Sequence, residues 1–391
     1  MGRRGKNQWR QQKGGRRLAG GEGAEDDEAG VLPSSAYEPE DREDQEEGEM
    51  AEDEEGDECG EERGGDVSPS KFHLYQKSVQ SPRGDVSYMQ KFFLMYVGGR
   101  TPLHLQEDFC GTALLSTEWL RSDPRRTAIG LDLDLEALDW CLENNLNRIG
   151  GDGFSRISLF HGNVLHPNEA NLVRPRLCDL VSQVTLDNQG GQLRAVDSVS
   201  ESDPAIQTGD VNSIADISGV KISSLPARDI ACAFNYSCCC LHRRADLVMY
   251  FKHVLGGLSK QGGIFIMDLY GGTSSECRLK LQRRFPGFTY IWEQQEFDII
   301  NRTTRISLHF QLGKKKTLRH AFSYNWRLWS LAEVKDCLKE AGFSSVHFWM
   351  REMPNTQLGS DSEDLFDAKY EEALSFQQRD SWNAYIVGVA P

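Results

Sequence analysis

The chain has 391 residues, ten cysteines and a formal net charge of −15 at pH 7. That length suits one large domain or two small ones. No apolar run approaches the roughly 18 residues of a bilayer-spanning helix, and the cysteines form no C-x-x-C pair of the kind that holds zinc. With no signal peptide in view, these features predict a soluble intracellular protein with reduced thiols, cytoplasmic or nuclear, and no contact with a membrane.

The charge is concentrated in the first 66 residues. Residues 1–18 carry seven arginines and lysines and no acid, whereas residues 22–66 carry 22 acids against two arginines, so the rest of the chain is nearly neutral. A segment of this composition buries too little apolar surface to offset the entropy of ordering. We therefore expect residues 1–66 to be a disordered tail, basic and then acidic. The basic end is either an arm that contacts RNA or protein or a solvated segment.

Residues 103–138 have the pattern of a strand, a tight turn, a helix and a second strand. The turn is Cys110-Gly111-Thr112, and the second strand ends at Asp132. In a doubly wound sheet this first turn presents backbone N–H groups and the positive end of a helix, while a carboxylate about 20 residues later binds ribose hydroxyls. The stretch therefore predicts half of a nucleotide-binding fold.

The turn is unsuited to a dinucleotide. It keeps one glycine, Gly111, of the G-x-G-x-x-G pattern that lets the backbone approach a diphosphate. Glu107 and Asp108, at the end of the preceding strand, would repel a phosphate and suit a cation.

These residues resemble the first motif of the class I S-adenosylmethionine-dependent methyltransferases, which reads acid-x-G-x-G-x-G. Glu107 stands at the acid and Gly111 at the middle glycine, while Phe109 and Ala113 replace the first and third glycines. The resemblance implies S-adenosyl-L-methionine as the cofactor and assigns no metal ligand. The cofactor site that it implies consists of Tyr75, Glu107, Phe109, Cys110, Gly111, Asp132, Leu133, Asn163, Val164 and Asn235.

Two helical stretches, broken at Ser81-Pro82, fill residues 71–93, with Asp85 as the expected N-cap of the second. In the resembled family such a leading pair often covers the cofactor. Tyr75 and Gln80 are therefore candidates to line it, although a tyrosine on an amphipathic helix can equally be core.

The adenine end of the site is expected after the helix 135–147 and the strand 157–160. In the resembled family an acid often follows this strand and accepts a hydrogen bond from the adenine amine. Asn163 stands there, and its amide oxygen would accept the same bond while Val164 packs on the ring.

Residues 182–227 lack any sustained periodicity and predict a disordered surface insertion. The pattern then resumes with a buried strand at 229–235, a helix at 245–258 and a strand at 264–268. Because ligands bind where parallel strands end, Asn235, Tyr236 and Tyr270 are the catalytic candidates, with a tyrosine or water taking the proton of an amine acceptor. The N-P-P-Y signature of amino-group DNA methylases is missing, which argues against base flipping.

From residue 286 to 328 the pattern becomes that of antiparallel strands, at 288–297, 303–312 and 318–326. In the resembled family a cap at this place forms the acceptor pocket. Trp326 and Arg327 would then supply an aromatic wall and an anion clamp, although alternating strand residues can also be cap core.

A helix at 331–341 and strands at 345–349 and 382–389 complete the pattern. We predict an α/β methyltransferase domain over residues 67–391, with a Rossmann-like, seven-stranded, doubly wound sheet, an antiparallel last strand and an antiparallel β cap.

The resemblance implies methyl transfer to a nitrogen or oxygen acceptor by in-line displacement, with a small molecule as the first expectation. Two alternatives remain. One is a protein or RNA methyltransferase that holds its substrate with residues 1–18. The other is an inactive scaffold, which the replacements at Phe109, Ala113 and Asn163 favour.

Overall fold

The computed structural model describes residues 38–39, 69–149, 151–174, 220–313, 316–353 and 369–391. The basic arm, nearly all of the predicted tail and most of the predicted insertion lie outside the described residues.

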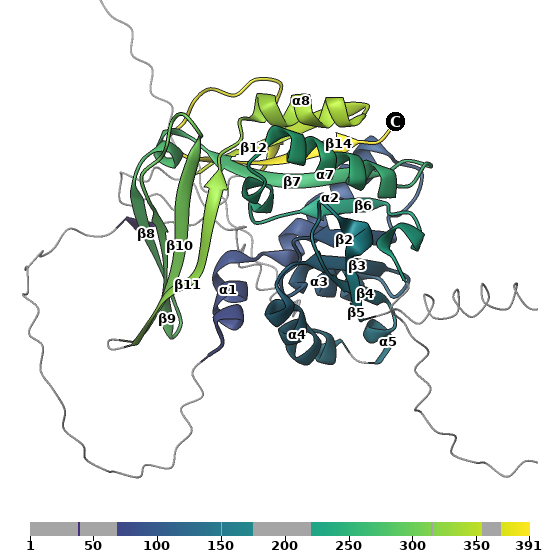
Figure 1. Ribbon diagram of the computed structural model, residues 1–391, viewed down its shortest axis with the longest axis horizontal. Coiled ribbons are helices and arrows are strands. Elements are labelled where there is room, and N and C mark those ends of the chain that lie inside the picture. The colour runs from purple at the N-terminus through teal and green to yellow at the C-terminus, as the bar shows by residue number, and fades with distance from the viewer. Residues whose placement is uncertain (1–37, 40–68, 150, 175–219, 314–315, 354–368) are drawn as a thin grey trace, which may run out of the picture. The chain divides into compact units, whose positions relative to one another are not determined.

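The larger of two sheets has the strand order β13-β12-β14-β7-β6-β2-β3-β4-β5 (Figure 1). The strands β4, β3, β2, β6 and β7 are parallel, and β14 runs antiparallel between β7 and β12. All seven predicted strands are present, and the short β5 and β13 extend the two edges. Their bounds are β2 His104–Asp108, β3 Thr127–Asp132, β4 Ile157–His161, β5 Asn171–Arg174, β6 Ile230–Ala233, β7 Ile264–Gly271, β12 Ser345–Glu352, β13 Glu371–Glu372 and β14 Trp382–Val389.

Helices cover both faces of this sheet, because strands such as β6, β7 and β14 contribute alternate apolar side chains to two separate clusters. The helices α2, α3 and α4 pack on one face, whereas α7 and α8 pack on the other, as a doubly wound fold requires. The helices are α1 Lys71–Val79, α2 Pro82–Tyr96, α3 Leu114–Ser122, α4 Leu135–Asn144, α5 Gly151–Phe154, α7 Arg244–Gly257 and α8 Leu331–Ala341. Short 3₁₀ helices are η1 Leu146–Arg148, η2 Pro167–Glu169, η4 Ile222–Ser224, η5 Ser237–Cys240 and η6 Thr273–Glu276.

The second sheet is the predicted antiparallel cap, with the order β1-β8-β9-β10-β11. Its strands β9 Phe288–Gln294, β10 Thr303–Leu312 and β11 Lys316–Arg327 match the three predicted ones. A fourth strand, β8 Leu279–Phe285, was not predicted, because three basic residues obscure its alternation, so the cap begins before residue 286.

At the cap's edge, β1 Glu38–Pro39 pairs with β8. The prediction of an entirely unstructured tail is therefore wrong for these two residues. Strand pairing uses backbone groups, which composition does not report.

The predicted insertion ends earlier than expected. Val220, Ile222 and Leu225 have exposed fractions of 6%, 2% and 8% and belong to the core on the α7 face of the sheet. Three apolar residues in a stretch rich in serine are too few to show a period, yet each fills a place in the core. Residues 220–227 are thus part of the folded domain, and the prediction that the insertion extends to 227 is wrong at that end.

Asp85 is not the N-cap of α2, since Ser81 holds that position. Its carboxyl is buried and accepts a hydrogen bond of 2.6 Å from the Tyr385 hydroxyl of β14. Burial raises the pKa of Asp85 to about 7. The folded protein therefore holds this proton more tightly than the unfolded chain does.

This raised pKa predicts a pH-dependent stability. Between the ordinary pKa of an aspartate, about 4, and about 7, the unfolded chain releases a proton that the folded protein keeps, so rising pH favours unfolding. We expect the melting temperature of the parent protein to fall between pH 5 and pH 8. The melting temperature of the Asp85→Asn variant should fall less steeply over the same range. Asp139→Asn, an exposed acid on α4, is the control and should follow the parent. Parallel curves for all three proteins would contradict the assignment.

Candidate functional site

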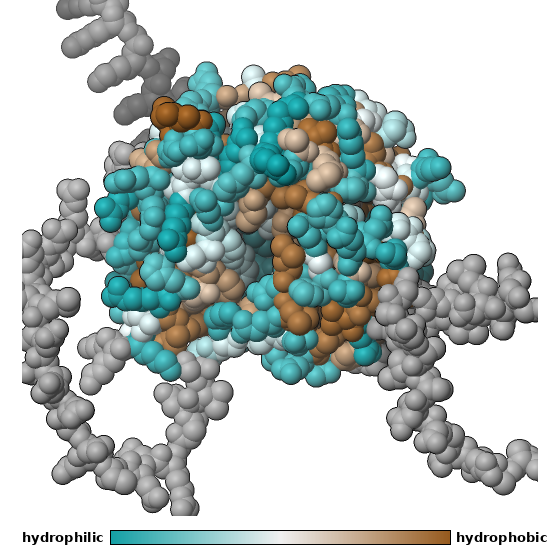
Figure 2. Space-filling model, viewed as in Figure 1, coloured by the Kyte–Doolittle hydropathy of each residue, from teal (hydrophilic) through white to brown (hydrophobic). Residues whose placement is uncertain are grey.

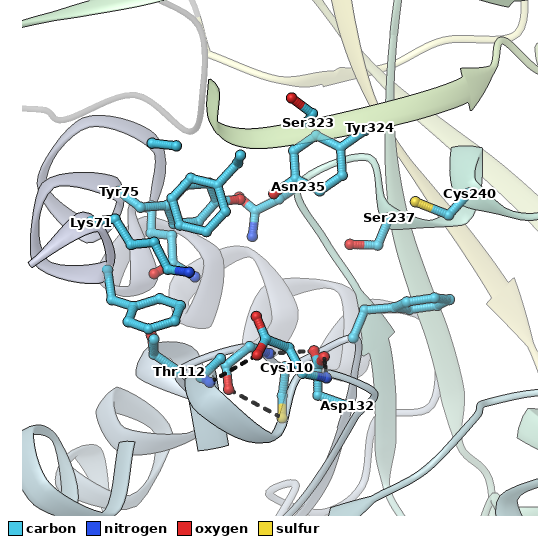
Figure 3. Close-up of a pocket in the computed structure, with 18 of the residues that line it drawn as sticks. Lys71, Tyr75, Cys110, Thr112, Asp132, Asn235, Ser237, Cys240, Ser323 and Tyr324 are labelled. Atoms are coloured by element: carbon cyan, nitrogen blue, oxygen red, sulfur yellow. Dashed lines mark hydrogen bonds between the residues drawn. The ribbon is translucent and has the colours of Figure 1, made fainter. Parts of the chain in front are cut away.

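A cavity of about 410 Å³ opens where the parallel strands end, between the large sheet and the cap. Figure 2 shows the surface hollowed between the two sheets, and Figure 3 shows side chains converging there from four parts of the chain. They come from α1, from the loops after β2 and β3, from the β6 exit with η5, and from β11. The lining residues are Lys71, Phe72, Tyr75, Gln80, Phe109, Cys110, Gly111, Thr112, Asp132, Asp134, Ala137, Asn235, Ser237, Cys240, Ala321, Phe322, Ser323, Tyr324 and Trp326.

The turn after β2 keeps the backbone shape of a glycine motif without its glycines. Phe109, Gly111 and Ala113 have φ values of 56°, 51° and 48°, so all three motif positions lie in the left-handed region. A non-glycine residue there costs roughly 1–2 kcal/mol. Both replacements keep the left-handed backbone, and the one at Phe109 adds a side chain to the cavity lining.

Asp132 joins this turn to the end of β3, as Figure 3 shows. Its Oδ2 accepts a hydrogen bond of 2.6 Å from the Gly111 N–H, and its Oδ1 accepts one of 2.8 Å from the Asp134 N–H. Burial raises the pKa of this carboxyl. The next acid, Asp134, is the N-cap of α4 and accepts from the Ala137 N–H at 3.1 Å, as expected of a capping aspartate.

Glu107 and Leu133 do not line the cavity, contrary to their predicted roles. The Glu107 carboxylate is buried and accepts from the N–H and hydroxyl of Ser116, at 2.9 and 2.6 Å. Ser116 is the third residue of α3, whose N-cap Ala113 has no side-chain acceptor, so Glu107 caps this helix instead. Its pKa is raised to about 8 by burial. Leu133 is 63% exposed.

Asn163 and Val164 also lie outside the cavity lining. The Asn163 amide oxygen accepts from the Leu165 N–H at 2.9 Å, a local turn that uses the oxygen expected to bind adenine. Val164 is buried with Leu131 and Tyr250.

The helix α1 closes one side of the cavity with Lys71, Tyr75 and Gln80. The Gln76 side chain donates a hydrogen bond of 2.7 Å to the Thr112 hydroxyl in the turn after β2. Lys71 reaches Glu136 on α4 at 2.8 Å. The expectation that this helix covers the site is thus met in its placement.

Two buried polar atoms of lining residues lack a hydrogen-bond partner among the described residues: the Nε1 of Trp326, a donor, and the Oε1 of Gln80, an acceptor. An unpaired buried acceptor costs roughly 1–3 kcal/mol. A ligand with an N–H donor would satisfy it.

Of the three catalytic candidates, only Asn235 lines the cavity. Tyr236 is buried behind it, with its hydroxyl 3.1 Å from Asn383 Oδ1. Tyr270 also lies behind the wall, with its hydroxyl 3.4 Å from Gln294 Oε1. Both tyrosine rings pack on Trp326, so they support the wall without facing the open space.

Trp326 and Arg327 point to opposite faces of β11, as neighbouring strand residues must. Trp326 lines the cavity. Arg327 donates to the His242 carbonyl at 2.7 Å and to Glu333 at 3.0 Å, and its guanidinium lies over the Trp329 ring. The prediction of an anion clamp at Arg327 is therefore wrong, because the side chain ties the cap to α8.

Several lining residues were not predicted, among them Ser237 and Cys240 on η5. Both occupy one face of this 3₁₀ helix, since residues three apart align there. Cys238 and Cys239 are buried, as expected of packing residues, but Cys240 is exposed to the cavity. The three-residue spacing of Ser237 and Cys240 in the sequence could have indicated that both side chains share one face of a 3₁₀ helix.

The sheet topology fits one fold family. Five parallel strands in doubly wound order, an antiparallel seventh strand inserted beside the fifth, and an antiparallel cap between strand five and the next helix are the features that the sequence resemblance implied. The chain has the class I methyltransferase fold.

No family model and no curated protein matches this sequence. Among solved structures, an S-adenosylmethionine-dependent methyltransferase from Clostridium acetobutylicum is 15% identical, covering 82% of this chain and 98% of its own, with a TM-score of 0.46. The sugar N-methyltransferase KedS8 from Streptoalloteichus is 12% identical, covering 86% and 99%, at 0.46. The methyltransferase CcbJ from Streptomyces caelestis is 11% identical, covering 83% and 94%, at 0.47. Likenesses this distant do not assign a ligand or a reaction.

Metal-binding clusters and membrane-spanning helices are both missing from the described part of the chain. It holds no group of three or more histidines, cysteines or acids placed to bind a metal ion. None of its helices combines the length and the apolar character needed to cross a membrane.

The corrected role of Arg327 is testable by its effect on stability. Arg327→Ala removes two charge-assisted hydrogen bonds and should lower the free energy of unfolding by about 1–3 kcal/mol, measured by urea denaturation. Ligand affinity should not change. Arg319→Ala, an exposed arginine on the same strand, is the control and should stay within about 0.5 kcal/mol of the parent. An Arg327→Ala variant that keeps its stability but binds the ligand poorly would instead support the anion-clamp role of Arg327.

Proposed function

We propose that the protein transfers a methyl group from S-adenosyl-L-methionine to a small-molecule acceptor, with nitrogen favoured over oxygen. The observation that carries this proposal is the pairing of Asp132 with the left-handed turn after β2 at the floor of a cavity that an aromatic cap closes.

The lining residues fit the proposed cofactor in charge and polarity. Asp132 lies where the ribose hydroxyls of a nucleoside would meet it, and both of its oxygens keep lone pairs beyond the two backbone bonds. The unpaired Gln80 oxygen suits an ammonium donor. The aromatic rings of Tyr75, Phe322 and Trp326 offer faces that attract a cation such as a sulfonium. When bound, the cofactor would supply a methyl group already activated by its positive sulfur.

The protein's contribution is orientation, because methyl transfer from a sulfonium needs a lone pair held in line and little else. Proximity of this kind can be worth roughly 7–11 kcal/mol. Walls from α1, η5 and β11 would restrict the acceptor to one approach and exclude water.

The preference for nitrogen rests on the lining side chains that could act as bases. Burial raises the pKa of Tyr75 and of Tyr324 above the ordinary tyrosine value, so both hydroxyls stay protonated and act as donors. No histidine or glutamate lines the cavity in the described part of the chain, and its two acids, Asp132 and Asp134, are already bonded to backbone N–H groups. A neutral amine needs no base before it attacks, whereas an alcohol does.

Two alternatives have no supporting observation among the described residues. A protein or RNA substrate held by residues 1–18 depends on a segment outside the description. An inactive scaffold is disfavoured by the loop geometry, because the replacements at Phe109 and Ala113 keep the left-handed backbone.

The direct test is a thermal-shift assay with S-adenosylmethionine, S-adenosylhomocysteine and NAD. We expect the first two to raise the melting temperature and NAD to leave it unchanged. Labelled-methyl transfer into fractionated metabolites and RNA then separates acceptor classes, with label expected on small amines. Stabilisation by NAD alone would overturn the proposal. Label found in RNA alone would mean that the acceptor is RNA and not a small molecule.

Asp132 provides a site-specific prediction. Asp132→Ala should weaken S-adenosylmethionine by at least about tenfold, or about 1.4 kcal/mol, because it removes the ribose acceptor and loosens Gly111. Calorimetry measures this loss directly. Asp139→Ala removes an exposed acid from α4, away from the cavity, and should bind like the parent. Equal affinities in both variants would contradict the placement of the cofactor.

The cap provides a second prediction. Trp326→Leu keeps an apolar side chain but removes the ring from the cavity wall. Methyl transfer into the small-molecule pool should fall about tenfold or more, since loss of orientation acts on the reaction step. The affinity for S-adenosylmethionine should change much less. Arg319→Ala again serves as the control, and parallel losses of transfer and affinity would mean that the cap shapes the cofactor site instead.

A further inference from the structure

The turn after β6 has an unusual backbone. Asn235 and Tyr236 follow one another with φ values of 57° and 59°, both in the left-handed region. Asparagine visits that region readily, but a bulky residue such as tyrosine rarely does. A strained conformation of this kind persists only where surrounding contacts hold it.

A single carboxylate from the neighbouring strand supplies those contacts. Asp268 on β7 accepts the Asn235 N–H with Oδ2 at 3.0 Å and the Tyr236 N–H with Oδ1 at 2.8 Å. The side chain is only 7% exposed. Both oxygens are thus used to hold two consecutive backbone N–H groups in the left-handed turn.

This turn determines which side chains enter the cavity. In Figure 3 the Asn235 amide projects into the open space, across from Asp132 and Cys110. Tyr236 turns the other way, into the core, where its ring lies 4.8 Å from that of Tyr270. If the turn relaxed to a right-handed backbone, Asn235 would lose this direction.

Burial of a carboxyl group is costly unless its polar atoms are hydrogen-bonded. Burial raises the pKa of Asp268 to about 8, and the two N–H bonds are its chief compensation. Asp85, equally buried at 8% exposed, bonds a tyrosine away from the cavity. The two acids share their burial and differ in what they hold, which makes them a matched pair.

We propose that Asp268 is a positioning residue: it holds the turn at Asn235 and Tyr236 left-handed and thereby directs the Asn235 side chain onto the bound ligand. The proposal rests on the proposed function, because S-adenosylmethionine is the ligand used as the probe.

The test is a double-mutant cycle on S-adenosylmethionine affinity, measured by calorimetry with Asp268→Asn, Asn235→Ala and the double variant. Each single variant should weaken binding at least fivefold. The double variant should lose clearly less than the product of the two single losses, because Asp268 acts through Asn235. A structural defect would instead multiply with the loss at Asn235.

Asp85→Asn is the control and should bind S-adenosylmethionine like the parent. Melting temperatures of both aspartate variants show whether each is folded, and Asp268→Glu, which keeps the charge but cannot reach both N–H groups from the same place, serves if Asp268→Asn does not fold. Unchanged affinity in the Asp268 variant, or multiplicative losses in the cycle, would overturn this inference alone. Failure of the parent protein to bind S-adenosylmethionine would overturn the proposed function and this inference with it.

Discussion

The site depends on buried acids that accept backbone N–H groups where the parallel strands end. Glu107 at the end of β2 caps α3 through Ser116, Asp132 at the end of β3 holds Gly111, and Asp268 on β7 holds the turn after β6. Glu107 and Asp132 lie at the ends of their strands and Asp268 lies within β7, and in each case the N–H groups belong to the loop or helix that follows a strand. The loops that form the cavity are therefore fixed to the sheet by hydrogen bonds to these carboxyl groups, and apolar packing supports them from behind.

The bonds to Asp268 explain how the turn after β6 forms without glycine. A loop that must turn left-handed usually carries glycine, because other residues pay a steric cost. Phe109, Asn235 and Tyr236 adopt the left-handed backbone despite this steric cost. The side chains of Phe109 and Asn235 line the cavity, and that of Tyr236 packs behind it. Burial of the acids also has an energetic cost, which is seen in the raised pKa values of Glu107 and Asp268, both about 8. The strained backbone and the buried acids thus lower the stability of the fold while they give the cavity lining a fixed shape, as is common at binding sites.

Sequence patterns predicted the strands of the large sheet well, because each is a short apolar run bounded by polar turns. They also placed Cys110, Gly111, Asp132 and Asn235 at the cavity, since strand ends gather at one edge of a parallel sheet. They failed where a decision depends on partners distant in the chain. The face of β11 that holds Trp326 follows from its pairing with β10, and the role of Glu107 follows from where Ser116 falls on α3. Likewise, the burial of Ile222 depends on the sheet face that it meets, which its polar neighbours in the sequence do not reveal.

The helix α1 forms one wall of the cavity and connects its two sides, because it is bonded to the turn after β2 and to α4 and it packs on the cap. Gln76 and Lys71 tie it to the turn after β2 and to α4, while the rings of Phe72 and Tyr75 lie 6.0 and 4.9 Å from that of Phe322 on the cap. The polar contacts of Gln76 and Lys71 contribute little to the stability of α1, because the Lys71 ion pair is exposed to water. Burial of Phe72, Leu74 and Val79 therefore holds α1 in place more than its polar contacts do. The aromatic contacts of Tyr236 and Tyr270 with Trp326 join the large sheet to the cap behind the cavity.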